Sequence, residues 1–553
     1  MNQNNFQEFK DLFFKSKKYW ILYLVLVTVL ALSTISKRNF TDPTFEIAIF
    51  ILVAIMGIFS ILFYFSHNSN DELYKVAFVI ILLFGITTAL IVPICDVSDE
   101  VEHLTRAEIT SQGVLVPHWT GDEVGIDRLY NHSDEGKYSN VKNDNVGFET
   151  IRSHMFFNDN REKTVFDVEG DTDKINYEPM IDGSAFEQNP FFGYLPQAIG
   201  IFMAKLLDLN VIWILWLGRI GNLVCYAGLI SLAIRKTPVL KIPLLAVACI
   251  PITIYQAASV SIDSMIIGLG ILAVAYFICM LKADKNSIEI RDVAIFTVIC
   301  LLLGLCKLTY LAFIFLLLFV PRDNFAFKRV IPTSLASISI VAICGVLWSR
   351  YSTPALMHSW RSKLNYVNSA EQISYFIHNP AFVQKFFTQI FTTDLAWMIY
   401  GIFNFFSAGS ANHYANTYYL IFVALFLFLF AILIFYPENN KFSIKTRLGT
   451  LLVLLIVYVG TCFVQLLTWA SVGYTNLGIN TRYFVPLIAL IPIIISLNKF
   501  NLDKPKFDNY SFILIITFMA TLILAFTTKY YWNFFLLKLN KFKEYLNIEK
   551  NIF

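Results

Sequence analysis

Charged residues are scarce in this sequence. Asp, Glu, Lys and Arg make up 15% of the 553 residues, whereas an ordinary soluble domain contains about a quarter. The formal net charge of +3 is too small to indicate a nucleic-acid partner. This scarcity of charge, together with a 56% share of apolar residues, excludes an ordinary soluble fold and indicates an integral membrane protein.

Paired cysteines and the signatures of several common enzymes are missing as well. The eight cysteines stand in or beside apolar runs, no C-x-x-C pair occurs, and the polar stretch from 96 to about 189 contains none of them. The sequence therefore predicts neither a disulfide framework nor a zinc site. No P-loop, dinucleotide fingerprint or nucleophile elbow stands in a suitable context, so ATP-driven transport and serine hydrolysis have no support.

What is present is a series of apolar runs long enough to cross a membrane. A hydrocarbon layer of ~30 Å requires about 20 helical residues, and backbone groups in lipid must be satisfied within the segment, so these runs must be helices. The first run begins at Tyr19 and ends at Ser36 without a cleavage site, so we read it as an anchor. We expect an all-α polytopic membrane protein with about 13 transmembrane helices, at about 19–35, 46–66, 76–95, 211–233, 242–260, 264–281, 293–306, 308–320, 331–349, 417–436, 448–469, 483–497 and 511–527.

The distribution of basic residues gives the expected orientation of these helices. The segment 191–209 is apolar but short and interrupted by Pro196, so we expect it to lie on the membrane without crossing it. With the N-terminus inside, the polar stretch after the third helix is then outside. The short basic loops fall inside, as the positive-inside rule requires; they carry Arg235, Lys236, Lys241, Lys282, Lys285, Arg291, Arg322, Lys328, Arg329, Lys441, Lys445, Arg447, Lys499, Lys504 and Lys506. The exceptions are Lys37, Arg38 and the basic tail after Lys529.

This orientation divides the chain into five parts. Residues 1–95 form an N-terminal three-helix membrane segment, and residues 96–210 form a large extracytoplasmic loop with an interfacial helix. Residues 211–349 form a membrane core, residues 350–416 a second extracytoplasmic loop, and residues 417–553 the C-terminal membrane helices and tail. Two large parts are therefore expected outside the membrane.

The most informative stretch is 96–107, where the third helix meets the outer surface. On a helix Asp99, His103 and Arg106 stand at i, i+4 and i+7 and share one face. A carboxylate there can act as a general base, and a guanidinium can hold a phosphate through two hydrogen bonds. The structural alternative is a helix that is capped by Ser98 and stabilised by ordinary acid–base pairs.

Charged residues also stand at the predicted outer ends of later helices. Asp263 lies between two serines at the start of a helix, where it can be a functional acid or a helix cap. Arg219 lies a turn or two inside its helix and needs a partner or a water-filled cavity, and an acid in the outer loop is the expected partner. Lys307 and Arg482 stand where a lipid phosphate would lie, although both can also be anchors that extend toward the headgroups.

The stretch Asp99-Glu100-x-x-His103-x-x-Arg106-Ala107 resembles the signature Pro-Asp-Glu-x-x-His-x-x-Arg-Ala of a bacterial family of large membrane proteins of unknown function. Ser98 stands where the family has Pro. Further blocks follow in the family's order over most of the chain from about 76 to 490. They are Gly193 to Gly200, Gly218-Arg219 with Asn222, Pro251 to Asp263, Lys307 to Tyr310, His378 to Pro380, and Arg482 to Pro486.

That family is in turn similar to the GT-C glycosyltransferases, which take a sugar from a polyprenyl-phosphate donor at the outer membrane face. The resemblance implies an essential Asp in the first large outer loop, a place that Asp99 or Glu100 fits. It implies a second acid in the next outer loop, a place that Asp263 fits. Some enzymes of this chemistry use a divalent cation such as Mg or Mn and others use none, and the sequence does not choose between them.

We therefore predict a GT-C-like glycosyltransferase of the bacterial plasma membrane. Its catalytic acids would be Asp99, Glu100 and Asp263, and its substrate-binding residues His103, Arg106, Arg219, Lys307 and Arg482. Its partners would be a polyprenyl-phosphate sugar donor, a cell-envelope glycan acceptor and membrane lipid. The alternatives are a polysaccharide polymerase or ligase with its catalytic residues in 350–416, a lipid-linked glycan transporter or flippase, and a scaffold with a degenerate site.

The expected orientation can be tested directly with topology reporters. A reporter fused after Val239 should give a cytoplasmic signal, and one inserted within 120–180 should give an external signal, because 191–209 does not cross the membrane. Two signals from the same side would mean that 191–209 crosses, and Asp263 would then lie on the cytoplasmic face.

Overall fold

The computed structural model of the chain describes residues 3–35, 44–67, 71–94, 96–116, 188–358, 367–402, 415–438, 441–495 and 502–528, with 173–175, 177, 184 and 186. These residues fold into helices and connecting loops. The only β-type pairings among them are isolated bridges, such as that between Lys174 and Asn210. The described part of the chain is therefore all-α, as the sequence predicted.

Long apolar helices dominate the described residues. Seven are long and apolar enough to cross a membrane: α3 (Thr44–Ser66), α4 (Leu73–Ile91), α9 (Ile212–Lys236), α12 (Asp263–Leu281), α14 (Val330–His358), α19 (Ile444–Thr468) and α22 (Lys504–Phe526). The bent pair of α1 (Gln3–Lys15) and α2 (Lys17–Ile35), with 60° between its two arms, makes an eighth if it counts as one span. The chain is a polytopic all-α membrane protein.

The expected number of about 13 spans is not reproduced, because several predicted spans are short or broken. The run 242–260 is divided into α10 (Lys241–Ala248) and α11 (Pro251–Ala257), and Ile250 before the proline is extended with φ −63° and ψ 152°. A proline disfavours helical backbone in the residue before it. Three other runs fall short of a long α-helix: α13 (Ile290–Cys306), the 3₁₀ helix η4 (Leu308–Phe319), and the group η9 (Thr481–Phe484), α20 (Val485–Ile488) and α21 (Ile491–Ile495). In α18 (Ala415–Ile434), the part Ile421–Ile434 is a shorter apolar helix.

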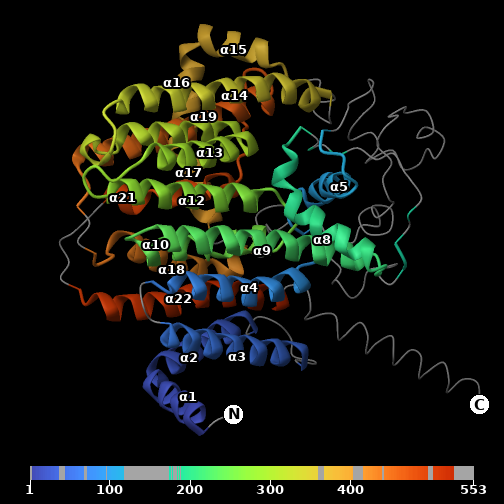
Figure 1. The fold of residues 1–553 in the computed structure, drawn as a ribbon. Coiled ribbons are helices and arrows are strands. Elements are labelled where there is room, and N and C mark those ends of the chain that lie inside the picture. The colour runs from blue at the N-terminus through green and yellow to red at the C-terminus, as the bar shows by residue number, and fades with distance from the viewer. Residues whose placement is uncertain are drawn as a thin grey trace, which may run out of the picture.

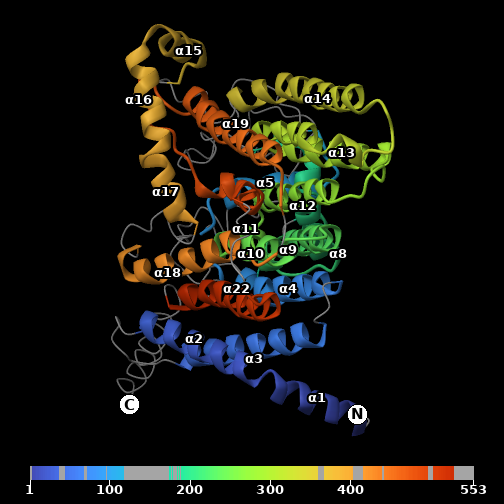
Figure 2. The same ribbon diagram turned by 90° about the vertical axis from the view of Figure 1, so that its left-hand side faces the viewer.

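The long helices lie side by side in successive layers. Figure 1 shows α4, α9, α12, α13 and α14 stacked in this order, and each packs against the next. The N-terminal helices α2 and α3 form one edge of the stack. The helix α15 (Ser369–His378) lies beyond the other edge, and α16 (Pro380–Phe391) and α17 (Thr393–Gly401) run in line from it along the side of the stack toward α18 (Figure 2).

Two short helices cover one end of this stack. The helix α5 (Glu100–Ser111) and the helix α8 (Leu195–Leu206), which follows the single 3₁₀ turn η3 (Phe191–Gly193), lie together beside α9 (Figure 1). At about 1.5 Å per residue, α8 is about 18 Å long, which is too short to cross the membrane. The segment 191–209 therefore has the short, proline-started helix that the sequence predicted.

The loops predicted to be cytoplasmic meet at the opposite end. Glu438 forms an ion pair of 2.8 Å with Lys504, and it also accepts a hydrogen bond of 2.7 Å from the backbone N–H of Leu240. These contacts join the loop after α9 to the loop before α19 and to the start of α22. Much of the two predicted outer segments lies outside the described residues: 117–172 and most of 176–187 in the first, and 359–366 and 403–414 in the second. The predicted domain boundaries in these segments stay predictions.

Two glycines allow α8 and α9 to approach closely. A Cβ on Gly200 would lie 2.0 Å from the backbone oxygen of Leu217, and a Cβ on Gly221 would lie 2.3 Å from that of Pro196. Because real Cβ atoms do not approach this closely, α8 lies against α9 only where both positions lack a side chain.

We expect Gly200→Ala to lower the thermal stability of the purified protein. The added methyl group meets backbone, which cannot rotate away, and overpacking of this kind costs about 1–3 kcal/mol. The matched control is Gly228→Ala on the neighbouring helix α9, where a Cβ meets nothing within 4 Å. A melting temperature for Gly200→Ala equal to that of the control would contradict the close α8–α9 packing.

Candidate functional site

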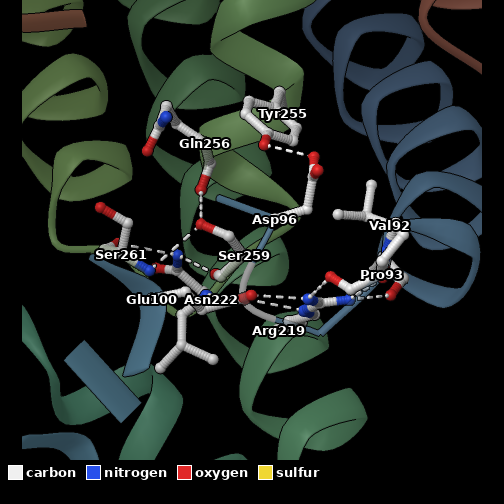
Figure 3. A network of polar contacts seen from close by, with 12 residues as sticks. Val92, Pro93, Asp96, Glu100, Arg219, Asn222, Tyr255, Gln256, Ser259 and Ser261 are labelled. Carbon is white, nitrogen blue, oxygen red and sulfur yellow. Dashed lines mark hydrogen bonds and ion pairs between the residues drawn. The ribbon is translucent and has the colours of Figure 1, made fainter. Parts of the chain in front are cut away.

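A buried ion pair joins the start of α5 to the N-terminal half of α9. The guanidinium of Arg219 donates to Glu100 through Nε at 2.8 Å and Nη2 at 2.6 Å, and both side chains are fully buried. The remaining N–H groups of Arg219 donate to the backbone oxygens of Ala89, Val92 and Pro93 at 2.7 to 3.0 Å. The five donors of a guanidinium are thus all used within the protein (Figure 3).

The carbonyl groups that Arg219 binds belong to the end of α4. The last carbonyls of a helix have no partner within the helix, and cations are favoured there because the helix dipole is negative at its C-terminus. Arg219 satisfies three such groups at or just after the end of α4. The pair between Arg219 and Glu100 therefore joins α4, α5 and α9 at one point.

Glu100 also fixes the turn between α11 and α12. Its Oε1 atom accepts a hydrogen bond of 3.2 Å from the backbone N–H of Val260. Asn222, one turn after Arg219 on α9, donates to the carbonyl oxygens of Ser259 and Ser261 at 2.6 and 3.0 Å (Figure 3). This turn ends at the first residue of α12, so its fixed geometry also fixes the position of Asp263.

Two carboxylates share the guanidinium of Arg482. Nη2 of Arg482 lies 2.6 Å from Oδ2 of Asp99, and Nε lies 2.9 Å from Oδ2 of Asp263. Nη1 donates to the backbone oxygen of Ser98 at 3.1 Å. The side chains of Arg482 and Asp263 are buried, whereas that of Asp99 is 48% exposed. The two acids therefore differ in access, and Asp99 is the one that an external molecule can reach.

The backbone of Asp99 is in the left-handed region, with φ 63° and ψ 14°. Asp99 stands immediately before α5, and its side chain makes no capping hydrogen bond. Residues other than Gly, Asn and Asp rarely adopt this backbone conformation, because it costs roughly 1–2 kcal/mol. The structural alternative of a helix capped by Ser98 is thus incorrect: Asp99 is at the cap position, and the carbonyl of Ser98 binds Arg482.

Lys307 lies beside this cluster, in the single-residue link between α13 and η4. Its Nζ atom lies 3.1 Å from the centroid of the Tyr483 ring, which follows Arg482 in the chain. The hydroxyl of Tyr310 donates to the backbone oxygen of Tyr483 at 2.7 Å and so fixes this segment to η4. Asp99, Asp263, Lys307 and Arg482 come from four distant parts of the sequence and form one cluster, which we call the charge cluster.

The other two residues of the signature stretch have different positions. His103 is buried, its ring stacks on Phe186, and its Nδ1 atom lies 2.7 Å from the hydroxyl of Tyr194. Burial lowers the pKa of His103 to about 4, so its ring is neutral at physiological pH. Arg106 is also buried, and it donates to the hydroxyl of Thr110 at 2.8 Å and to two backbone oxygens.

The sequence-predicted residues therefore separate into three groups. Asp99, Asp263, Lys307 and Arg482 meet in the charge cluster, whereas Glu100 and Arg219 bind each other beneath it, and His103 and Arg106 hold α5 in place. Sequence reasoning gave no role to Asn222, Gln197 or Tyr483. Asn222 could have been found from the sequence, because it stands three residues after Arg219 and therefore on the same helix face. Gln197 likewise donates to carbonyls of the same turn, those of Val260 and Ser261, at 3.4 Å.

The two carboxylates of the charge cluster, on Asp99 and Asp263, are already paired with the guanidinium of Arg482. Within the described residues, no group of three or more His, Cys, Asp and Glu side chains is arranged to hold a metal ion. A divalent cation bound by Asp99 and Asp263 would compete with Arg482 for both carboxylates.

We expect Glu100→Gln to destabilise the protein strongly. The amide keeps the shape of the side chain but leaves the charge of Arg219 buried without a counterion, and breaking a buried pair in this way costs about 3–5 kcal/mol. The matched control is Glu72→Gln, because Glu72 forms an exposed pair with Lys75 and such pairs contribute about 0–1 kcal/mol. Equal melting temperatures of the two variants would show that the buried pair does not support the fold.

Comparison with known proteins gives one match. Residues 82–491 match the family described as "Predicted membrane protein (DUF2142)". No curated protein and no solved structure matches the chain. The matched range agrees with the range of about 76 to 490 over which the sequence resembled a membrane family of unknown function, and it contains every member of the charge cluster. The chain belongs to this family of predicted membrane proteins of unknown function, DUF2142.

Proposed function

We propose that the chain is a membrane glycosyltransferase of the GT-C type in the bacterial plasma membrane. It would take a sugar from a polyprenyl-phosphate donor at the outer face and transfer it to a cell-envelope glycan or a lipid-linked oligosaccharide. The observation that carries this proposal is the charge cluster, in which the accessible carboxylate of Asp99 lies beside a second acid and two cations. General-base chemistry requires such a carboxylate, and a phosphate leaving group requires such cations.

The reaction would be a displacement at the anomeric carbon of the donor sugar. The acceptor oxygen forms a bond to this carbon while the bond from the carbon to the phosphate oxygen breaks. The electron pair of the breaking bond leaves with the polyprenyl phosphate, and the proton of the acceptor hydroxyl passes to Asp99. A cation near the phosphate stabilises the charge that develops on the leaving group. Attack from the side opposite to the phosphate inverts the anomeric centre.

Exposure favours Asp99 over Glu100 as the base. Glu100 is fully buried and accepts hydrogen bonds from Arg219 and from the backbone N–H of Val260, so its carboxylate is not accessible to an acceptor hydroxyl. The side chain of Asp99 is 48% exposed. Its left-handed backbone is held between the turn after α4 and the start of α5. We therefore assign the base to Asp99 and a structural role to Glu100 and Arg219.

Asp263 would act as the second acid beside the base. It is the first residue of α12, where the positive end of the helix dipole favours a carboxylate. Its carboxylate is buried and holds Nε of Arg482. Through this contact Asp263 fixes the orientation of the guanidinium that binds Asp99, so its role would be to position the base.

A polysaccharide polymerase or ligase is the second candidate, and one set of contacts favours it. The segment 367–402 reaches the charge cluster through the loop after α19. Gln389 donates to the backbone oxygen of Thr475 at 2.6 Å, and the hydroxyl of Thr481, next to Arg482, donates to the backbone oxygen of Met398 at 3.2 Å. A polymerase that bound its growing chain along this segment would use the same cluster.

We expect Asp99→Asn to abolish most sugar transfer without unfolding the protein. Asparagine also tolerates left-handed backbone, but it cannot accept the proton, so the rate should fall by about 10²- to 10⁴-fold. The assay is incorporation of labelled sugar from a panel of polyprenyl-phosphate hexoses into envelope glycan in membrane vesicles. The matched control is Asp208→Asn, because Asp208 is also left-handed, with φ 47°, and exposed. Parental transfer rates for Asp99→Asn would refute the assignment of the base.

A further inference from the structure

We infer that the two cations of the charge cluster have different roles: Lys307 binds the phosphate of the donor lipid, and Arg482 positions the two acids. This inference rests on the proposed function and deepens it. The ligand would be the phosphoryl anion of a polyprenyl phosphate, whose neutral tail would lie in the membrane. The two cations differ in how many of their donor groups already have partners within the protein.

Arg482 is committed to partners within the protein. Its Nη2 and Nε atoms form ion pairs with Asp99 at 2.6 Å and Asp263 at 2.9 Å, and its Nη1 atom donates to the carbonyl of Ser98 at 3.1 Å. Its side chain is 4% exposed. A phosphate bound by this guanidinium would compete with the two carboxylates for one buried cation, and displacing Asp263 would leave a buried acid without its countercharge. The same change would remove the group that orients the base.

Lys307 has donor groups to spare. Within the described part of the chain, its Nζ atom donates no hydrogen bond and forms no ion pair, and its contact is with the ring face of Tyr483 at 3.1 Å. An ammonium carries three N–H donors. The residue is half-buried, so it keeps access to the exterior of the protein. A compact ammonium of this kind binds phosphate as a point charge.

The surroundings of Lys307 keep this ammonium in place before any ligand arrives. The ring face of Tyr483 attracts a cation, and the Tyr483 segment is itself fixed by the hydrogen bond from Tyr310. Lys307 lies between α13 and η4, so its backbone is anchored on both sides. A preorganised cation stabilises a leaving phosphate without rearrangement during the reaction.

Binding of a prenyl phosphate to the full chain in phosphatidylcholine nanodiscs tests this division of roles. The probe is farnesyl phosphate, and binding is measured by native mass spectrometry beside the melting temperature of each variant. We expect Lys307→Met to weaken binding at least tenfold at an unchanged melting temperature, and Lys307→Arg to retain most of the binding. Arg482→Gln should lower the melting temperature, while binding to the folded fraction stays within about threefold of the parent. Parental binding by Lys307→Met, or lost binding by Arg482→Gln at a parental melting temperature, would overturn the inference.

Competing ligands identify the source of the phosphate. Farnesol should not displace farnesyl phosphate if the phosphate is recognised, and displacement by farnesol would overturn the inference. Inorganic phosphate should compete only at a concentration at least tenfold higher than farnesyl phosphate. Competition at equal concentration would show that the site takes free phosphate and would overturn the lipid assignment.

Transfer kinetics separate this inference from the proposed function. Lys307→Met should raise the KM for the donor, whereas Arg482→Lys should lower kcat at an unchanged donor KM, because it disturbs the base and not the phosphate. If the parent binds farnesyl phosphate through Lys307 but transfers no sugar, the inference stands and the glycosyltransferase proposal fails. If the parent transfers sugar and Lys307→Met does so equally well at limiting donor, the proposal stands and the inference fails.

Discussion

The geometry at the end of the helix stack that α5 and α8 cover depends on the buried ion pair between Glu100 and Arg219. Removing two charges from water is costly, and the cost is offset only when every polar atom of the pair finds a partner. Here the guanidinium uses all five donors, on Glu100 and on the carbonyls at the end of α4. The pair thus connects the end of one long helix, the start of α5 and, through Val260, the turn before α12.

The buried pair determines the position of the charge cluster above it. Asp99 precedes Glu100 in the chain. Asp263 follows the turn between α11 and α12, whose backbone is hydrogen-bonded to Glu100 and Asn222. Arg482, which belongs to η9, forms ion pairs with both of these acids. Four charges from distant parts of the sequence are therefore held at fixed distances, with Asp99 half-exposed and Lys307 half-buried. Under the proposed function, a fixed carboxylate beside a fixed cation would suit transfer from a phosphate leaving group.

Sequence reasoning identified the all-α membrane fold and the members of the cluster, because run length and charge near a membrane are strong constraints. It could not separate Asp99 from Glu100. Their difference arises from the left-handed backbone of Asp99, which turns one side chain outward and the next one inward. It also overestimated the number of spans, since Pro251, Pro486 and Pro492 interrupt runs whose composition alone is suitable for long helices.

The most direct test of the account is a structure of the full chain in nanodiscs with a bound polyprenyl-phosphate sugar. We predict that the phosphate lies within hydrogen-bond distance of Lys307, that the sugar lies next to the carboxylate of Asp99, and that the pair between Glu100 and Arg219 is unchanged. A donor bound elsewhere, with the charge cluster closed and without contact to the lipid, would contradict the central claim that this cluster is the functional site.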